Sequence, residues 1–346
     1  MHGILQKALR DERISNEELL ILLESERWTD IVQVGDAVRK RSLDPKRVGY
    51  TAYRLINYTN VCDVDCTFCS FQDEVASKRS YVLSLDEIRS KAIEAKELGA
   101  DQVLFQGGVH VGIPKQYYVD ALTLLHHELG MHVRGFSPVE IKRYAETFGQ
   151  SIPEFLAEMK SAGLGSVPGA GAEILTERMR HKLSPRKLPL EEWCSVMGQC
   201  HQAGLPGSAN IVFGSDELHE DIVGHLDAIR TQQDLTGGFK SFVPWIFQPQ
   251  TKRFFIRHVT GAEYLKMVAI CRIYLDNVAH IEASALVMGK ELAELALYAG
   301  ADDINSFVIE ENVLRSRGLS SEAGAQKFIR EAGFEPYRRD FNFSHE

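Results

Sequence analysis

The sequence lacks both a long apolar stretch and an excess of basic residues. No apolar run approaches the roughly 18 residues that a membrane-spanning helix needs, and the N-terminus lacks the apolar core of a secretory signal. The net charge is −9 at pH 7, whereas proteins that bind nucleic acids usually present a basic face. We therefore expect a cytoplasmic protein with neither a membrane nor a nucleic acid among its partners.

Cysteine is also scarce, with six residues in a chain of 346. That number does not suit the disulfide framework of a short secreted protein. Cys194, Cys200 and Cys271 lie within apolar helical patterns, where a free cysteine packs as a small hydrophobic residue. The composition, 44% hydrophobic, is sufficient for a large core in one or two domains.

The other three cysteines lie close together in the sequence. Cys62, Cys66 and Cys69 have the spacing C-x3-C-x2-C, and the aromatic Phe68 precedes the last of them. Three thiolates from one loop would leave one iron of a four-iron cluster open to a small molecule. Structural zinc prefers four protein ligands, and no histidine or fourth cysteine lies nearby in this segment. We therefore favour a 4Fe–4S cluster over a zinc site or a disulfide.

Short apolar runs alternate with amphipathic stretches from residue 53 onward. Such alternation predicts a parallel sheet, and eight repeats match a (β/α)8 barrel of the TIM type. The predicted strands are Tyr53–Tyr58, Gln102–Phe105, Met131–Phe136, Gly165–Val167, Ser208–Phe213, Ser241–Phe247, Ala279–Ala283 and Asp302–Ser306. The predicted helices between them are Leu85–Leu98, Lys115–Leu129, Pro153–Ala162, Leu190–Ala203, His219–Leu235, Ala262–Asp276 and Lys290–Tyr298.

The region before the first predicted strand reads as helical. Apolar positions recur there at helical spacing, and Ser15 with Glu18 forms a capping box. We expect an N-terminal helical extension over residues 1–48, and a barrel with a C-terminal extension over residues 49–346.

Most of the chemically distinctive segments follow a predicted strand. In a (β/α)8 barrel the active site is built from the loops at the carboxyl ends of the strands. These segments are residues 62–69, 106–108, 137–140, 168–173, 214–217, 248–249, 284 and 305–306. Their common position predicts a site at one rim of the barrel.

The cysteine segment resembles the signature of the radical S-adenosylmethionine (radical SAM) superfamily. The resemblance implies that one electron passed through the cluster cleaves S-adenosylmethionine (SAM) and yields a 5′-deoxyadenosyl radical. It also implies that Phe68 and the segment Gln106-Gly107-Gly108 contact SAM, with the segment receiving its amino group. A double glycine is otherwise an ordinary turn signal.

Two further segments gain a role from this resemblance. Glu173, in Gly169-Ala-Gly-Ala-Glu173, would contact the SAM ribose, although a carboxylate in the first turn of a helix also suits the helix dipole. Ile211 and Val212 would flank the adenine, or they are plain core residues.

The chain from about residue 50 to 343 resembles one branch of this superfamily, which contains cyclic dehypoxanthine futalosine synthase, aminofutalosine synthase and the deazaflavin-forming FO synthase subunits. The segments most similar to the first family are residues 57–62, 106–108, 135–138, 172–175, 236–239, 244–249, 300–303 and 309–313. The resemblance implies the cyclase step of the futalosine route to menaquinone. There the adenosyl radical takes the sugar C4′ hydrogen, the carbon radical adds to the benzoate ring of the same molecule, and loss of an electron and a proton restores aromaticity.

Polar residues at the rim are candidates for substrate binding and proton transfer. We expect Arg134, Ser137, Gln248 and Asn305 to bind substrate. Candidate catalytic residues are Ser137, Asp303 and Glu310, and each of these polar residues could instead be a strand-end cap or a rim hydrogen bond. Arg134 could grip a benzoate group if it points inward.

Several positions depart from the cyclase pattern, namely Asp63, Asp65, Arg134, Ser215 and Asn305. Acids beside an anionic cluster should make its reduction harder, and the other changes fall on the predicted substrate side. A different enzyme of the same branch therefore stays a second hypothesis, and a non-catalytic iron–sulfur or zinc sensor a third. An enzyme of this kind needs an electron donor such as flavodoxin or ferredoxin.

Overall fold

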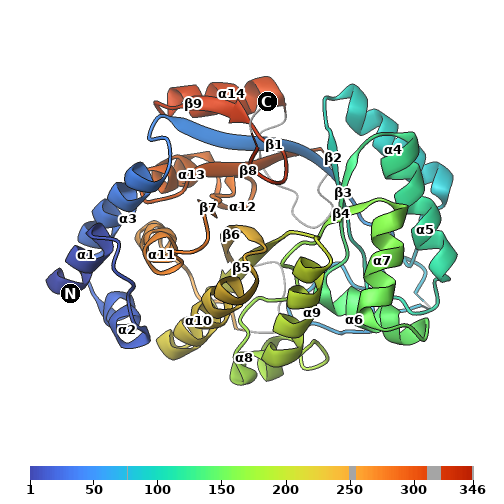
Figure 1. Cartoon of the computed structure of the whole chain (residues 1–346), viewed down its shortest axis with the longest axis horizontal. Helices are drawn as coiled ribbons and strands as arrows, with labels where there is room; N and C mark the ends of the chain where they lie inside the picture. Colours follow the sequence, from blue (N-terminus) through green and yellow to red (C-terminus); the bar gives the residue numbers. More distant parts are fainter. Residues whose placement is uncertain (76, 249–254, 310–320, 345–346) are drawn as a thin grey trace.

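A computed structural model of the protein describes residues 1–346 except 76, 249–254, 310–320 and 345–346. Its centre is a ring of parallel strands in the order of the chain (Figure 1). Single bridges between Val167 and Gly207 and between Glu282 and Asp303 join the two sheets into a closed barrel. The strands are β1 (Arg47–Ile56), β2 (Gln102–Phe105), β3 (His132–Gly135), β4 (Leu164–Ser166), β5 (Gly207–Phe213), β6 (Phe239–Ile246), β7 (His280–Ile281) and β8 (Asp303–Ile309). The predicted (β/α)8 fold is confirmed.

Helices surround this ring and cover its outer face (Figure 1). They are α4 (Leu85–Glu97), α5 (Lys115–Thr123) with its continuation η1 (Leu124–Glu128), α6 (Pro138–Thr147), α7 (Ile152–Ala162), α8 (Glu177–Leu183), α9 (Leu190–Gln202), α10 (His219–Thr236), α11 (Gly261–Tyr274), α12 (Ala285–Met288), α13 (Lys290–Leu297) and α14 (Glu322–Glu331). All seven predicted helices are present, while α6, α8, α12 and α14 were not predicted. The segment from Ser137 to Glu140, which reads as a polar loop, is the capped first turn of α6.

The N-terminal region forms α1 (His2–Leu9), α2 (Asn16–Glu24) and α3 (Trp28–Ser42), and the capping box of Ser15 and Glu18 is present. Helix α3 packs on α11, and α2 packs on α10 (Figure 1). A Cβ atom on Gly35 of α3 would lie 2.5 Å from the carbonyl oxygen of Ala299. Glycine therefore permits the close approach of this helix to the barrel. The domain boundary near residue 48 stays a prediction.

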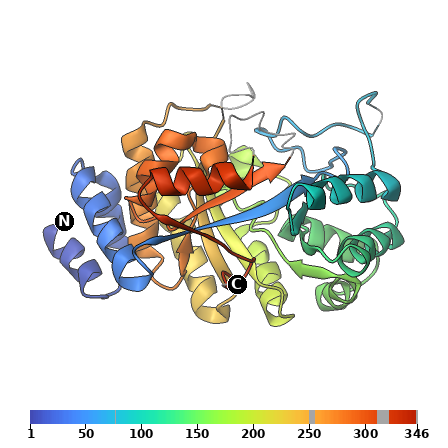
Figure 2. The same cartoon turned by 90° about the horizontal axis from the view of Figure 1, so that it is seen from above.

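The C-terminal segment covers the end of the barrel where the strands begin. Strand β9 (Glu335–Arg338) pairs in parallel with the start of β1. Beyond it, Phe341 stacks on His132 and Phe343 on His280, with ring centres 5.5 and 3.7 Å apart. Because these histidines begin β3 and β7, the segment lies opposite the long loop that follows β1, as Figure 2 shows.

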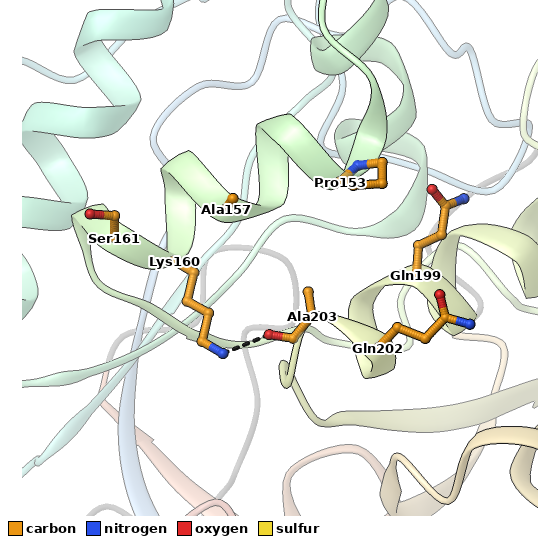
Figure 3. A pocket seen from close by; sticks show the side chains of 7 residues that line it. All are labelled: Pro153, Ala157, Lys160, Ser161, Gln199, Gln202 and Ala203. Carbon is orange, nitrogen blue, oxygen red and sulfur yellow. Dashed lines mark hydrogen bonds between the residues drawn. The ribbon is translucent and has the colours of Figure 1, made fainter.

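One cavity, of about 580 Å³, lies outside the barrel between α7 and α9. Beside it, Lys160 donates a hydrogen bond of 2.6 Å to the carbonyl oxygen of Ala203 (Figure 3). Its lining contains none of the predicted site residues.

None of the helices in the described ranges combines the length and the apolar character needed to cross a bilayer.

Candidate active site

The second cavity, of about 480 Å³, lies at the carboxyl ends of the strands. Most of the predicted site residues line it, although they come from loops far apart in the sequence. They are Cys62, Cys66, Phe68, Cys69, Gln106, Gly107, Gly108, Arg134, Ser137, Glu173, Val212, Gln248 and Asn305. The structure thus brings the predicted cluster, SAM and substrate residues into one cavity.

The three cysteines face this cavity from the loop after β1. Cys66 is buried, and Cys62 and Cys69 are half-buried. Burial raises the pKa of the Cys62 and Cys66 thiols, while the backbone amide of Val109 donates to the Cys62 sulfur at 3.4 Å. As placed, these thiols do not form a compact metal site, nor does any other group of His, Cys, Asp or Glu in the described residues. Three thiols from one loop with an amide donor beside them nevertheless match the donor set of an iron–sulfur cluster.

The acidic residues of the cluster loop do not line the cavity. Asp63 and Asp65 are both exposed, and Asp65 accepts a hydrogen bond from Gln72 at 2.8 Å. Because water and salt screen exposed charges, these acids should affect cluster reduction less than their sequence position implies.

The double glycine packs directly on the cluster loop. A Cβ atom on Gly108 would lie 2.1 Å from the Val61 carbonyl oxygen and 2.9 Å from the Cys62 Cβ. The Gly108 amide donates to the Thr59 carbonyl oxygen at 2.9 Å. Only glycine fits this position, so the strand-end signal reflects a close backbone approach to the cluster loop.

Glu173 lies in the cavity wall, and its carboxylate has two cationic partners. Its Oε1 is 2.9 Å from Lys187 Nζ, and its Oε2 is 3.2 Å from Arg180 Nη1. Lys187 also lies over the Phe68 ring, 5.2 Å from its centre. The sequence reasoning missed both cations. The signal that could have found them is the basic run that follows the glycine segment, residues 178–187.

Strand β5 presents only alternate residues to the cavity. Ser208, Asn210 and Val212 line it, whereas Ile211 is fully buried and faces the opposite side. Successive side chains of a strand point to opposite faces, so the two neighbours could not both flank one ligand through their side chains. The burial of Ile211 fits the alternative of a core residue, a contact of its backbone with the adenine stays a prediction, and Val212 lines the cavity.

Arg134, in β3, lies at the inner end of the cavity. Its Nη2 donates to the Ser208 hydroxyl at 2.5 Å, and its guanidinium lies over the Phe341 ring at 5.1 Å. Its Nε is buried without a hydrogen-bond partner. Across the described residues, no carboxylate forms an ion pair with this guanidinium. A cation so placed suits an anionic group of a ligand.

The remaining predicted residues differ in what they can offer a ligand. The Ser137 hydroxyl is 2.6 Å from Glu140 Oε2, as part of the cap of α6. Asn305 donates to Glu282 at 2.5 Å and accepts from Tyr53 at 3.3 Å. Gln248 lines the cavity. Glu310 lies outside the described residues.

Asp303 does not line the cavity, contrary to the prediction of a catalytic role. It is fully buried at the first position of β8, and its carboxylate pairs with Arg339 at 2.7 and 3.0 Å. Burial raises the pKa of Asp303, and Arg339 opposes that shift. The predicted strand ended at Ser306, but β8 continues to Ile309. Asp303 therefore lies at the end of the barrel away from the cluster loop.

Comparison with known proteins agrees with this geometry. Residues 56–229 match the radical SAM superfamily, and residues 236–346 match the CofH/MqnC C-terminal region. The solved structure of methylornithine synthase superposes with a TM-score of 0.74 at 18% identity, covering 97% of both chains. The hydrogenase maturase HydG from Carboxydothermus hydrogenoformans superposes with a TM-score of 0.78 at 17% identity, covering 99% of this chain and 80% of that one. These likenesses support the fold.

Curated relatives are more similar in sequence. The cyclic dehypoxanthine futalosine synthase of Halalkalibacterium halodurans is 36% identical, over 99% of this chain and 94% of that protein. The enzyme of the same name from Streptomyces coelicolor is 37% identical, over 100% and 88%. A 5-amino-6-(D-ribitylamino)uracil–L-tyrosine 4-hydroxyphenyl transferase of Methanocaldococcus jannaschii is 35% identical, over 89% of each.

The family match confirms the predicted cofactors, a 4Fe–4S cluster and SAM. That Cys62, Cys66 and Cys69 bind the cluster stays a prediction, which rests on their spacing and on their place in the cavity. The chain belongs to the radical SAM superfamily, as an enzyme closely related to cyclic dehypoxanthine futalosine synthase.

Proposed function

We propose that this chain cyclises dehypoxanthine futalosine in menaquinone biosynthesis. The observation that carries the proposal is the similarity to two cyclic dehypoxanthine futalosine synthases over nearly the whole chain. The cluster and SAM would supply a 5′-deoxyadenosyl radical when bound. The protein's task is then to hold the sugar C4′–H near that radical and the benzoate ring near the sugar, an orientation effect that can be worth several kcal/mol.

Residues of the cavity could divide this task. Cys62, Cys66 and Cys69 would hold the cluster, with SAM between Phe68, the double glycine and Glu173. Arg134 would bind the benzoate carboxylate, because its guanidinium has no acidic ion-pair partner in the described part of the chain. Gln248, Asn305 and Ser137 would contact hydroxyl groups of the substrate.

A second candidate is the reaction named for the archaeal relative, transfer of a 4-hydroxyphenyl group from L-tyrosine to 5-amino-6-(D-ribitylamino)uracil. It is favoured by an identity close to that of the cyclases and by Arg134, which departs from the cyclase pattern. Tyrosine also carries a carboxylate that Arg134 could bind.

The reductant and the compartment are part of the proposal. We infer that flavodoxin, ferredoxin or a similar donor delivers the electron in the cytoplasm. None of the six cysteines forms a disulfide, which suits a reducing compartment.

The test is an anaerobic assay with purified, reconstituted enzyme, SAM and dithionite. Dehypoxanthine futalosine goes into one reaction, and tyrosine with the ribitylaminouracil into another. We expect a product lighter by two hydrogen atoms from the first and none from the second, by mass spectrometry. Unchanged dehypoxanthine futalosine alongside released 5′-deoxyadenosine would reject the cyclase proposal, and a product in the second reaction would establish the transferase.

A further inference from the structure

Glu140 is a buried carboxylate directly behind the double glycine, and none of the roles assigned above uses it. It is 1% exposed, at the third position of α6. Its Oε2 accepts from the amide and the hydroxyl of Ser137, at 2.7 and 2.6 Å. Its Oε1 accepts from the Tyr58 hydroxyl at 2.6 Å and from the Gly107 amide at 3.4 Å. One carboxylate thus joins the start of α6, the end of β1 and the double glycine.

Tyr144 extends these contacts to the next residues of the glycine segment. Its hydroxyl lies 2.9 Å from that of Tyr58 and 3.3 Å from the Gly108 carbonyl oxygen, to which it donates. It also accepts from the His110 amide at 3.4 Å. The backbone from Gly107 to His110 is therefore held from behind at three points, by Glu140 and Tyr144.

The front of the same segment contacts the cluster loop. Besides the Gly108 contact with Thr59, the Asp63 amide donates to the Val109 carbonyl oxygen at 3.0 Å, and the Val109 amide donates to the Cys62 sulfur. A shift of the double glycine would therefore move atoms that touch a cluster ligand.

A capping role alone does not require this burial. Glu154 caps α7 with the same geometry, accepting from the amide and hydroxyl of Ser151 at 2.7 and 2.6 Å, but it is exposed. Burial raises the pKa of Glu140, because a charged carboxyl loses its hydration there. No cation forms an ion pair with it within the described residues. The extra donors at Oε1 compensate part of that cost.

We propose that Glu140 is a positioning residue for SAM. It fixes the Gly107–Gly108 backbone against the cluster loop, so that the amino-acid end of SAM meets a preformed surface beside the cluster. The inference goes beyond the proposed function, because it concerns SAM and holds for either candidate substrate.

The test compares Glu140→Gln with Glu154→Gln. A neutral amide offers one acceptor oxygen where the carboxylate offers two, so the Glu140 variant must lose acceptors on one side. We expect the Kd for SAM, measured by equilibrium dialysis of the reconstituted protein without substrate, to rise about tenfold or more. Iron content per chain should stay at the wild-type value, and the Glu154 variant should bind SAM as the wild type does.

A milder variant covers the case in which Glu140→Gln fails to fold. Tyr144→Phe removes only the hydroxyl that touches Gly108, and we expect it to weaken SAM binding severalfold with little change in Tm. Unchanged SAM affinity in a folded Glu140→Gln protein would overturn the proposal. So would an equal loss in the Glu154 variant, or wild-type affinity in Tyr144→Phe if that is the only variant that folds.

Discussion

At the scale of single residues, Arg134 is the residue that we propose to bind the carboxylate of the substrate. It is anchored by the Ser208 hydroxyl and the Phe341 ring, and its Nε has no partner. The nearby carboxylate of Glu282 is held by Arg339 and Asn305 instead. A buried cation without a close counter-ion is costly, and a substrate carboxylate would provide that counter-ion.

Replacing Arg134 by Gln should therefore affect the substrate and spare SAM. We expect KM for dehypoxanthine futalosine to rise about tenfold or more, because a charge-assisted bidentate pair is lost. The rate of 5′-deoxyadenosine release without substrate should change little. Steady-state kinetics check the first statement and single-turnover SAM cleavage the second. An intermediate KM is expected for Arg134→Lys, which keeps the charge without the planar fork. An unchanged KM in the Gln variant would exclude the proposed contact.

What the sequence predicts about residues depends on how local the signal is. The spacing of Cys62 to Cys69 and the double glycine are local, and these residues lie in the cavity. The predictions for Ile211 and Asp303 depended on which face of the strand a residue occupies and on where the strand begins and ends. A short apolar run determines neither. Lys187 reaches the site through an ion pair with Glu173. The basic run of residues 178–187 is visible in the sequence, but it does not show which of its cations meets that carboxylate.

At the scale of elements, the C-terminal segment after β9 closes the end of the barrel where the strands begin, and it does so with a buried ion-pair cluster. Arg339 pairs with Asp303 and Glu282, and all three side chains are at most 3% exposed. The barrel and seven of its helices could be predicted from alternating patterns, whereas α6, α8, α12 and α14 were not. This segment could not, because β9 joins β1 in parallel from nearly 290 residues away.

Arg339 and its neighbour Arg338 form a natural pair for comparison. Arg339→Met would leave two buried carboxylates without their cation, and we expect a loss of about 3–5 kcal/mol in the free energy of unfolding. Arg338 contacts Glu322 and Asp101 near the surface, so Arg338→Met should cost about 1 kcal/mol or less. Urea unfolding monitored by circular dichroism measures both values. Equal losses in the two variants would contradict a structural role specific to Arg339.

At the scale of the whole molecule, the two ends of the barrel differ in what covers them. One end is filled by the C-terminal segment, and the other carries the cavity with the cysteine loop, the double glycine and Glu173. Radical chemistry needs a substrate held in near-attack geometry and shielded from water. The cavity of about 480 Å³ at the loop end of the barrel is where a substrate would have to be held in this way.

The central claim is that Cys62, Cys66 and Cys69 hold a cluster that cleaves SAM. The most direct measurement is iron content and 5′-deoxyadenosine release after anaerobic reconstitution, for the wild type, Cys66→Ala and Cys200→Ala. Cys200 is a buried cysteine of α9 outside the cavity, so its variant controls for the loss of a buried thiol. We predict about four irons per chain and SAM cleavage for the wild type and Cys200→Ala, with both lost in Cys66→Ala. Retention of cluster and cleavage in Cys66→Ala, or a colourless zinc-loaded wild type, would contradict the claim.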